Sequence, residues 1–178
     1  MGKVRTVMLA GGLVALCATG TGIADTPAAK NFVTHLTGDE EVPSRGTDAA
    51  GQAIFTLSDD DLSLSYRLIA SNIENVVASH IHLGAFGVNG GVVAFLAGPF
   101  DPGGGHSDGI LAEGVITSAD LVGALAGMDF SVLVAAMRTG GTYVNVHTND
   151  GIDPANTGAG DFPGGEVRGQ IRSAGPAE

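Results

Sequence analysis

Three histidines on two short segments have the spacing of a metal site. His80 and His82 are two residues apart in segment 78–83, and His147 lies near the end of segment 142–148. Both segments alternate in the manner of a β-strand, in which residues two apart project from the same face. Neutral imidazoles suit both copper and zinc as ligands. If the two strands are neighbours, we expect the three histidines to form one site.

Three imidazoles leave a fourth coordination position open. An open position is typical of catalytic zinc, whereas a fourth protein ligand would close the site. His106, which follows three glycines, is the candidate for that fourth ligand. A purely structural interpretation is also open, in which His80 and His82 donate hydrogen bonds to loop carbonyls and hold the turn at 84–90.

Polar residues on the same strands are candidates to support the ligands. Asn145 is predicted to share a face with His147, where it could orient an imidazole or make only a cross-strand hydrogen bond. Glu166 and Arg168 share a face of the predicted last strand and carry opposite charges. We expect this pair to fix the strand register and to satisfy buried polar groups. In a redox protein, Arg168 would attract a small anion.

Acidic clusters elsewhere lack the pattern of a catalytic or calcium site. Glu40 and Glu41 are adjacent, so in an extended chain they point to opposite faces, and we interpret them as a solvated or edge-protecting turn. The clusters at 59–61 and 149–153 offer oxygen ligands without EF-hand spacing, so calcium is not favoured. The sequence has no nucleophile elbow, phosphate loop or dinucleotide motif, and no nucleotide cofactor is expected.

The elements that must position these residues are short strands joined by turns. Residues 62–70 alternate cleanly, and the 29 glycines are spread through the connections. One short helix is expected at 118–125, capped by Ser118. The expected strands are 31–37, 51–57, 62–70, 76–83, 92–97, 110–116, 131–137, 142–148 and 165–171. The pattern predicts an all-β fold, a Greek-key β-sandwich or barrel of about eight short antiparallel strands with at most one short helix.

The N-terminus has the layout of a secretory signal peptide. Lys3 and Arg5 precede an apolar run at 7–17, and small residues lead to a predicted cleavage before Asp25. The run is too short to span a bilayer. A lipoprotein acylated at Cys17 is not favoured, because the preceding residue is a leucine. We predict an exported protein, periplasmic or secreted, with a signal peptide at 1–24, a linker at 25–30, a β domain at 31–173 and a tail at 174–178.

The charge of the chain restricts its partners. It carries 8 Lys+Arg against 19 Asp+Glu, a formal net charge of −11, and all the acidic residues follow the predicted signal peptide. Such a chain repels nucleic acids and anionic membranes. We therefore expect an extracellular protein or small ligand as partner, no nucleic acid, and no transmembrane segment in the processed chain. Cys17 is the only cysteine, so the exported domain would depend on its core or on a metal rather than on disulfides.

Several motifs, in order, resemble the CHRD domain, a module first recognised in chordin and common in exported bacterial proteins. They are LTGDEEVP at 36–43, GQAIF at 51–55, ASHIHLG at 78–84 with GVNG at 87–90, YVNVHT at 143–148 and PGGEVRGQI at 163–171. Together they run from about residue 32 to 172. The resemblance implies a domain type but no activity, because the biochemical role of the family is largely unassigned.

A second likeness concerns the metal. The strand His80-Ile81-His82 is similar to the copper-ligand strand of Cu,Zn superoxide dismutases, which are also Greek-key barrels. Those enzymes have further zinc ligands and a disulfide, whereas here only His35 and His106 remain as spare imidazoles. The expected function is a binding or interaction module that holds one copper or zinc ion. The alternatives are a superoxide dismutase-like copper redox enzyme and a purely structural extracellular module.

Overall fold

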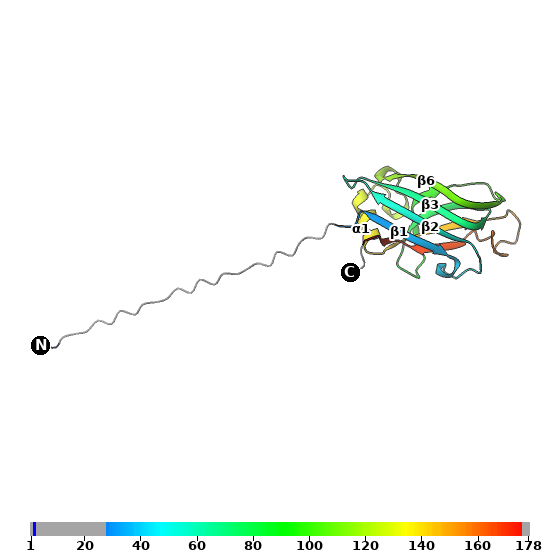
Figure 1. Ribbon diagram of the computed structural model, residues 1–178, viewed down its shortest axis with the longest axis horizontal. Coiled ribbons are helices and arrows are strands. Elements are labelled where there is room, and N and C mark those ends of the chain that lie inside the picture. The colour runs from blue at the N-terminus through cyan, green and yellow to red at the C-terminus, as the bar shows by residue number, and fades with distance from the viewer. Residues whose placement is uncertain (1, 3–27, 176–178) are drawn as a thin grey trace.

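A single antiparallel sheet curls into a nearly closed barrel (Figure 1). The computed structural model describes residue 2 and residues 28–175, so the predicted signal peptide lies outside it apart from residue 2. The strands are β1 (Asn31–Thr37), β2 (Ala50–Leu57), β3 (Ser63–Glu74), β4 (Val76–Leu83), β5 (Gly91–Ala97), β6 (His106–Thr117), β7 (Thr142–Thr148), β8 (Val167–Gln170) and β9 (Arg172–Ser173). The order across the sheet is β5-β4-β7-β8-β1-β2-β3-β6, and β9 pairs with β1. The predicted antiparallel all-β fold is confirmed.

The two ends of this order, β5 and β6, are bridged through side chains and a connecting segment. Tyr66 of β3 donates a hydrogen bond from its hydroxyl to the Leu96 carbonyl of β5, at 2.7 Å. The Val122 amide donates to the Val93 carbonyl at 2.9 Å. The gap in the barrel is therefore spanned without a continuous ladder between the edge strands.

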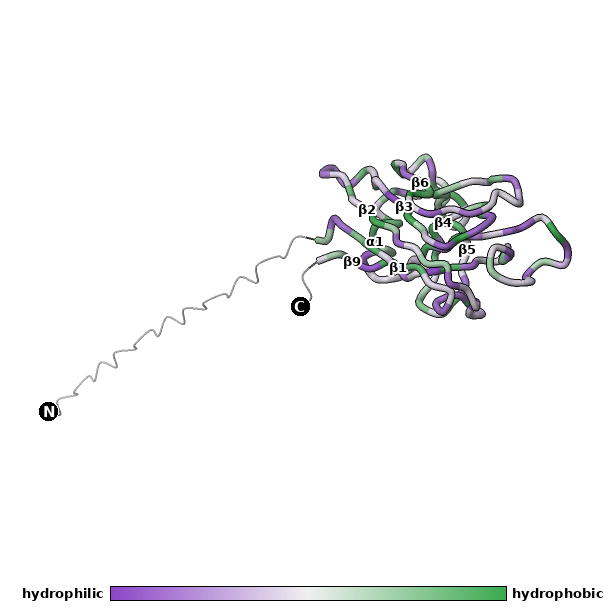
Figure 2. Tube along the Cα trace, turned by 45° about the vertical axis from the view of Figure 1, so that its right-hand side comes forward, coloured by the Kyte–Doolittle hydropathy of each residue, from purple (hydrophilic) through white to green (hydrophobic). Residues whose placement is uncertain are grey.

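Alternation along the strands fills the barrel with apolar side chains. On β2, Ala53, Phe55 and Leu57 are buried while Ile54 and Thr56 are exposed. The same period of two places Phe32 and Leu36 of β1 in the core. Figure 2 shows hydrophobic residues concentrated along the strands and hydrophilic residues in many of the connecting loops. Burial of this face is the main stabilising term of the domain.

The strand predicted at 131–137 is wrong, because this segment is the helix α1 (Phe130–Arg138). Its buried residues have helical spacing and are Phe130, Leu133, Val134 and Met137. The helix lies at the end of the barrel where both ends of the described chain emerge (Figure 1), and its apolar face joins the core. The β-branched valines suggested a strand, but the period of the apolar residues fits a helix. Among the described residues, no helix is both long and apolar enough to cross a membrane.

The prediction of one helix at 118–125 is also wrong, because this segment forms two separate 3₁₀ turns. They are η2 (Ser118–Asp120) and η3 (Gly123–Leu125). Thr117 caps the first turn in place of Ser118, in a reciprocal arrangement with Asp120. Gly123 has φ +56°, and a Cβ there would lie 2.3 Å from the Val92 carbonyl oxygen. The contact with β5 thus requires a glycine and interrupts the helix.

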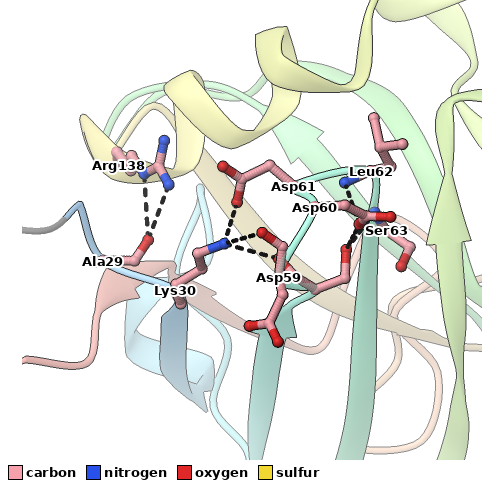
Figure 3. A network of polar contacts seen from close by, with 9 residues as sticks. Ala29, Lys30, Asp59, Asp60, Asp61, Leu62, Ser63 and Arg138 are labelled. Carbon is pink, nitrogen blue, oxygen red and sulfur yellow. Dashed lines mark hydrogen bonds and ion pairs between the residues drawn. The ribbon is translucent and has the colours of Figure 1, made fainter.

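The acidic cluster at 59–61 has a lysine as its partner. Lys30 donates from Nζ to the carbonyls of Ser58 and Asp59 and to the Asp61 carboxylate, at 2.9, 3.0 and 2.7 Å (Figure 3). Asp60 accepts from the Leu62 amide and so caps the β2–β3 turn. The Lys30 ammonium therefore already binds the oxygen atoms that a calcium ion would use as ligands. One further short turn, η1 (Gly38–Glu40), follows β1.

Candidate metal centre

The predicted histidine strands are neighbours, and their polar side chains form a layer on the outer face of the barrel wall. β7 pairs with β4 on one side and with β8 on the other, with His80 opposite Asn145 and Asn145 opposite Arg168. The alternate residues Ile81, Val144, Val146 and Val167 point into the core. This outer layer contains the polar side chains of His80, His82, Tyr143, Asn145 and Arg168. Loops cover the layer, so none of these residues is more than 9% exposed.

The structure brings the three predicted ligands together. Ligand nitrogens of His80, His82 and His147 all lie within 4.8 Å of one another. Nδ1 of His80 is 3.1 Å from Nε2 of His147, a hydrogen bond in which His80 donates, so an ion at this place would replace that proton. Zinc–nitrogen bonds of 2.0–2.1 Å at tetrahedral angles place two ligand nitrogens roughly 3.3 Å apart. The cluster therefore needs only small side-chain adjustments to surround one ion.

Backbone carbonyls set the tautomers of two of these imidazoles. Nδ1 of His82 is 2.9 Å from the Gly90 carbonyl oxygen, and Nδ1 of His147 is 2.8 Å from that of Pro163. A carbonyl can only accept, so each Nδ1 carries the proton and each Nε2 presents a lone pair. Metal-ligating histidines commonly donate their other N–H in this way. The hydrogen bond from His82 also matches the structural interpretation of the turn at 84–90.

The three imidazoles are held in the neutral form that binds metals. Burial lowers the pKa of His80 to about 4, and the neighbouring His147 and His82 add to this effect. Burial is also the main cause that lowers the pKa values of His82 and His147, although hydrogen bonds to Gly90 and Pro163 oppose it. Protons therefore compete weakly for these nitrogens at neutral pH.

His106, the candidate fourth ligand, is not brought to the cluster. It begins β6, where its Nε2 is 2.8 Å from an Asp108 carboxylate oxygen, and its Nδ1 is 4.0 Å from Glu74. His35 is exposed on β1. In the described part of the chain, the trio is the one group of three or more His, Cys, Asp or Glu residues close enough to share a metal ion. The three histidines would thus leave a fourth position open.

Glu41 belongs to the site although the sequence pattern placed it in a solvated turn. It is only 6% exposed, and burial raises its pKa to about 7. The guanidinium groups of Arg168 and Arg45, the Val42 amide and the Asn145 amide oppose this rise. The turn η1 carries Glu41 inward over the outer layer of polar residues. A carboxylate in a turn between Gly38 and Pro43 shows no periodic pattern of burial, so only the three-dimensional path of the loop could reveal it.

Arg168 secures the loop that covers the histidines. Its guanidinium donates to the carbonyls of Ala85 and Val88 and to the side chain of Asn89, at 3.3, 3.0 and 2.9 Å. It also lies 3.5 Å from the ring centre of Tyr143, which in turn stacks on His82. Within the described residues, no carboxylate lies within ion-pair distance of Arg168. The buried guanidinium of Arg168 is therefore paired with two backbone carbonyls and the Asn89 side chain rather than with a carboxylate.

Glu166 is fully buried and ties three segments together. It accepts hydrogen bonds from the hydroxyls of Thr47 and Thr148, at 2.6 and 2.7 Å, and from the Gly160 amide at 2.9 Å. These contacts join the β1–β2 loop, β7 and the 149–166 loop, which includes the Pro163 carbonyl that orients His147. Glu166 thus acts on the site by holding the loop beside it.

Replacing Glu166 with Gln should lower the free energy of unfolding by about 2–3 kcal/mol, because an NH₂ donor would face hydroxyl or amide donors in a buried position. Urea unfolding at pH 7.5 measures the change. Glu113→Gln is the matched control, since the Arg67–Glu113 pair is exposed and should be worth no more than about 1 kcal/mol. An equal change in both variants would contradict this role.

Comparison with known proteins identifies the domain. The CHRD domain model matches residues 32–171, which include every strand of the barrel except the first residue of β1 and the two-residue β9. Searches of curated proteins and of solved structures gave no match. The matched region contains the three histidines, Glu41, Asn145, Glu166 and Arg168. The chain therefore belongs to the CHRD domain family.

Proposed function

We propose that this chain is an exported CHRD module that binds one copper or zinc ion through His80, His82 and His147. The observation that carries the proposal is the convergence of three neutral imidazoles, with ligand nitrogens within 4.8 Å of one another. Nε2 of His82 is buried and has no hydrogen-bond partner within the described chain. A buried lone pair of this kind is costly unless a cation or a donor satisfies it.

Export rests on the sequence of the N-terminus, with its two basic residues and apolar run. Outside the cytoplasm, the ion would cross-link β4 and β7 through their side chains. Zinc would supply Lewis acidity, and copper would supply redox chemistry as well. Either role is compatible with an interaction module whose loops are held in place around the ion.

Elemental analysis tests the proposal most directly. The processed protein, purified from its exported location without a histidine tag, should contain near-stoichiometric copper or zinc, and the His80→Ala/His82→Ala variant should not. His35→Ala/His106→Ala removes the same number of imidazoles outside the cluster and should keep the metal. A wild-type protein without metal that also takes up none on titration would contradict the proposal.

The open fourth position favours a second candidate, a superoxide dismutase-like copper enzyme. This candidate requires the copper-loaded protein to cycle between two oxidation states and to consume superoxide. A copper-loaded protein that binds the metal tightly but shows neither property would contradict the enzyme and leave the binding module as the remaining function. A purely structural module would lose stability in the His82→Ala variant to the same extent with and without metal.

A further inference from the structure

A groove of about 490 Å³ lies beside the first half of β6, which is one edge of the sheet. This hollow, the seam groove, is lined by Val76, Phe100, Asp101 and most of the segment 104–111. The connection between β5 and β6 forms one wall, and β6 itself forms the other. None of the three predicted metal ligands lines the seam groove, so it is a separate feature of the barrel.

Hydrogen bonds hold the wall that joins β5 to β6 in place. The Phe100 amide donates to the Val77 carbonyl at 2.8 Å. Gly105 donates from its amide to Oδ1 of Asn75 at 3.0 Å and accepts from the Asn75 amide at 2.8 Å. Gly104 and Gly105 have no side chains, and a Cβ on either would meet no atom within 4 Å. A ligand could therefore approach this wall closely without first having to order the loop.

Each wall contributes one large, exposed apolar side chain to the seam groove. Phe100 of the connection is 52% exposed, and Ile110 of β6 is 56% exposed. Leu111 also lines the groove and packs against the core. Single exposed apolar residues are ordinary, but two on the walls of one hollow gain free energy together when an apolar group covers them.

The rim of the seam groove is acidic. Asp101 and Asp108 line it. Glu74 and Asp48 line an adjoining hollow of about 420 Å³, and His106 lines both. No lysine or arginine of the described chain lines either hollow, and the ion pairs that these residues make involve other carboxylates. This part of the surface therefore attracts cationic groups.

We propose that the seam groove binds a basic peptide segment of a partner protein, with one apolar side chain between Phe100 and Ile110 and flanking cationic side chains at the acidic rim. A small cation would gain only from the rim, and a neutral apolar ligand would gain only from the walls. A segment that carries both groups complements the whole groove in charge and in polarity. Because this surface lies apart from the three histidines, the inference goes beyond the proposed metal site and does not depend on it.

The probe is an acetylated pentapeptide amide with a tryptophan between two pairs of lysines, titrated at pH 7.5 in chelator. The chain contains no tryptophan, so a blue shift of the peptide emission reports burial of this anchor alone. Ile110→Ser should weaken binding about fivefold, because it removes apolar area from one wall. Val115→Ser is the matched control and should bind as the wild type, since Val115 lies on the same strand, is 60% exposed and does not line the groove.

Charge reversal tests the acidic rim. Asp101→Lys/Glu74→Lys should weaken binding at least about tenfold in about 50 mM NaCl, and the difference should shrink in about 500 mM NaCl. Asp39→Lys/Asp129→Lys makes the same change in net charge at two exposed carboxylates outside the groove, and should change the affinity less than about twofold. Asp101→Asn/Glu74→Gln, with a smaller expected loss in the same direction, serves if the reversed variant does not fold.

Competing peptides test the two kinds of contact separately. A peptide with alanine in place of tryptophan should compete at least about tenfold more weakly, and one with glutamates in place of the lysines should not compete. An equal loss in both charge-reversed variants would show that overall charge alone attracts the peptide and would overturn the inference. Equal competition by the alanine and tryptophan peptides, or a wild-type dissociation constant weaker than about 1 mM, would also overturn it. Chelator is present throughout, so none of these outcomes depends on whether the histidines bind metal.

Discussion

Replacing His82 with alanine is expected to weaken Zn²⁺ binding at pH 7.5 by at least about 100-fold. The loss of a partner that merely orients a ligand costs 10- to 100-fold, and the loss of one of three ligands should exceed it. His82 is the most consequential choice, because its Nε2 is buried with no hydrogen-bond partner among the described residues and its Nδ1 is already bonded to Gly90. Isothermal titration with a competing chelator measures the two dissociation constants.

Thermal or urea unfolding provides an independent check. At a Zn²⁺ concentration 100 times the wild-type dissociation constant, binding should stabilise the wild type by about 2.7 kcal/mol and the variant by about 0.4 kcal/mol. Each protein is compared with itself plus chelator, so the lost hydrogen bond to Gly90 cancels. His106→Ala should behave as the wild type, since His106 is paired with Asp108 away from the cluster. Equal stabilisation of wild type and His82→Ala would show that His82 is no ligand.

The Glu41→Gln variant should gain stability relative to the wild type as the pH rises from 5 to 8, by about 2–3 kcal/mol. Burial raises the pKa of Glu41 to about 7 in the folded state from 4.5. Between these two values, the folded protein binds more protons than the unfolded chain. The contribution of the Glu41 carboxyl to wild-type stability is therefore full at low pH and is lost as the pH rises through 7. Glutamine does not titrate, so the variant does not lose this contribution.

Urea unfolding of both proteins in chelator, at pH 5 and pH 8, measures the difference. The three histidines also make stability depend on pH, in the opposite sense, because their folded pKa values are lowered and acid favours the unfolded chain. Both proteins carry the same histidines, so this contribution cancels. A stability difference that does not change with pH would show that Glu41 is ionised at little cost.

The local pattern of the sequence was sufficient for the histidine strands. Their alternation specifies which side chains share a face, and this is a local property of extended backbone. The apolar residues at 81, 144 and 146 require the opposite face to be buried, so the register could not slip by one residue without exposing them. For the same reason, the all-β class and most of the strand positions could be predicted.

Local pattern was misleading where two periods competed. Segment 130–138 contains valines that favour strands, but Phe130, Leu133, Val134 and Met137 have helical spacing and pack into the core. At 118–125, the approach of Gly123 to β5 breaks a helix that propensity alone would permit. In both cases packing against the sheet decided between conformations of similar local free energy.

The chain by itself determined that His80 and His82 project together and that His147 could join them. Only the tertiary structure decided that β4 and β7 are neighbours, that Gly90 and Pro163 orient the imidazoles, and that His106 stays away. It also brought Glu41 across from a turn more than one hundred residues from Asn145 in the sequence. The physical reason is that strand faces follow from covalent geometry, whereas the burial and charge of a loop residue depend on which distant segments pack around it.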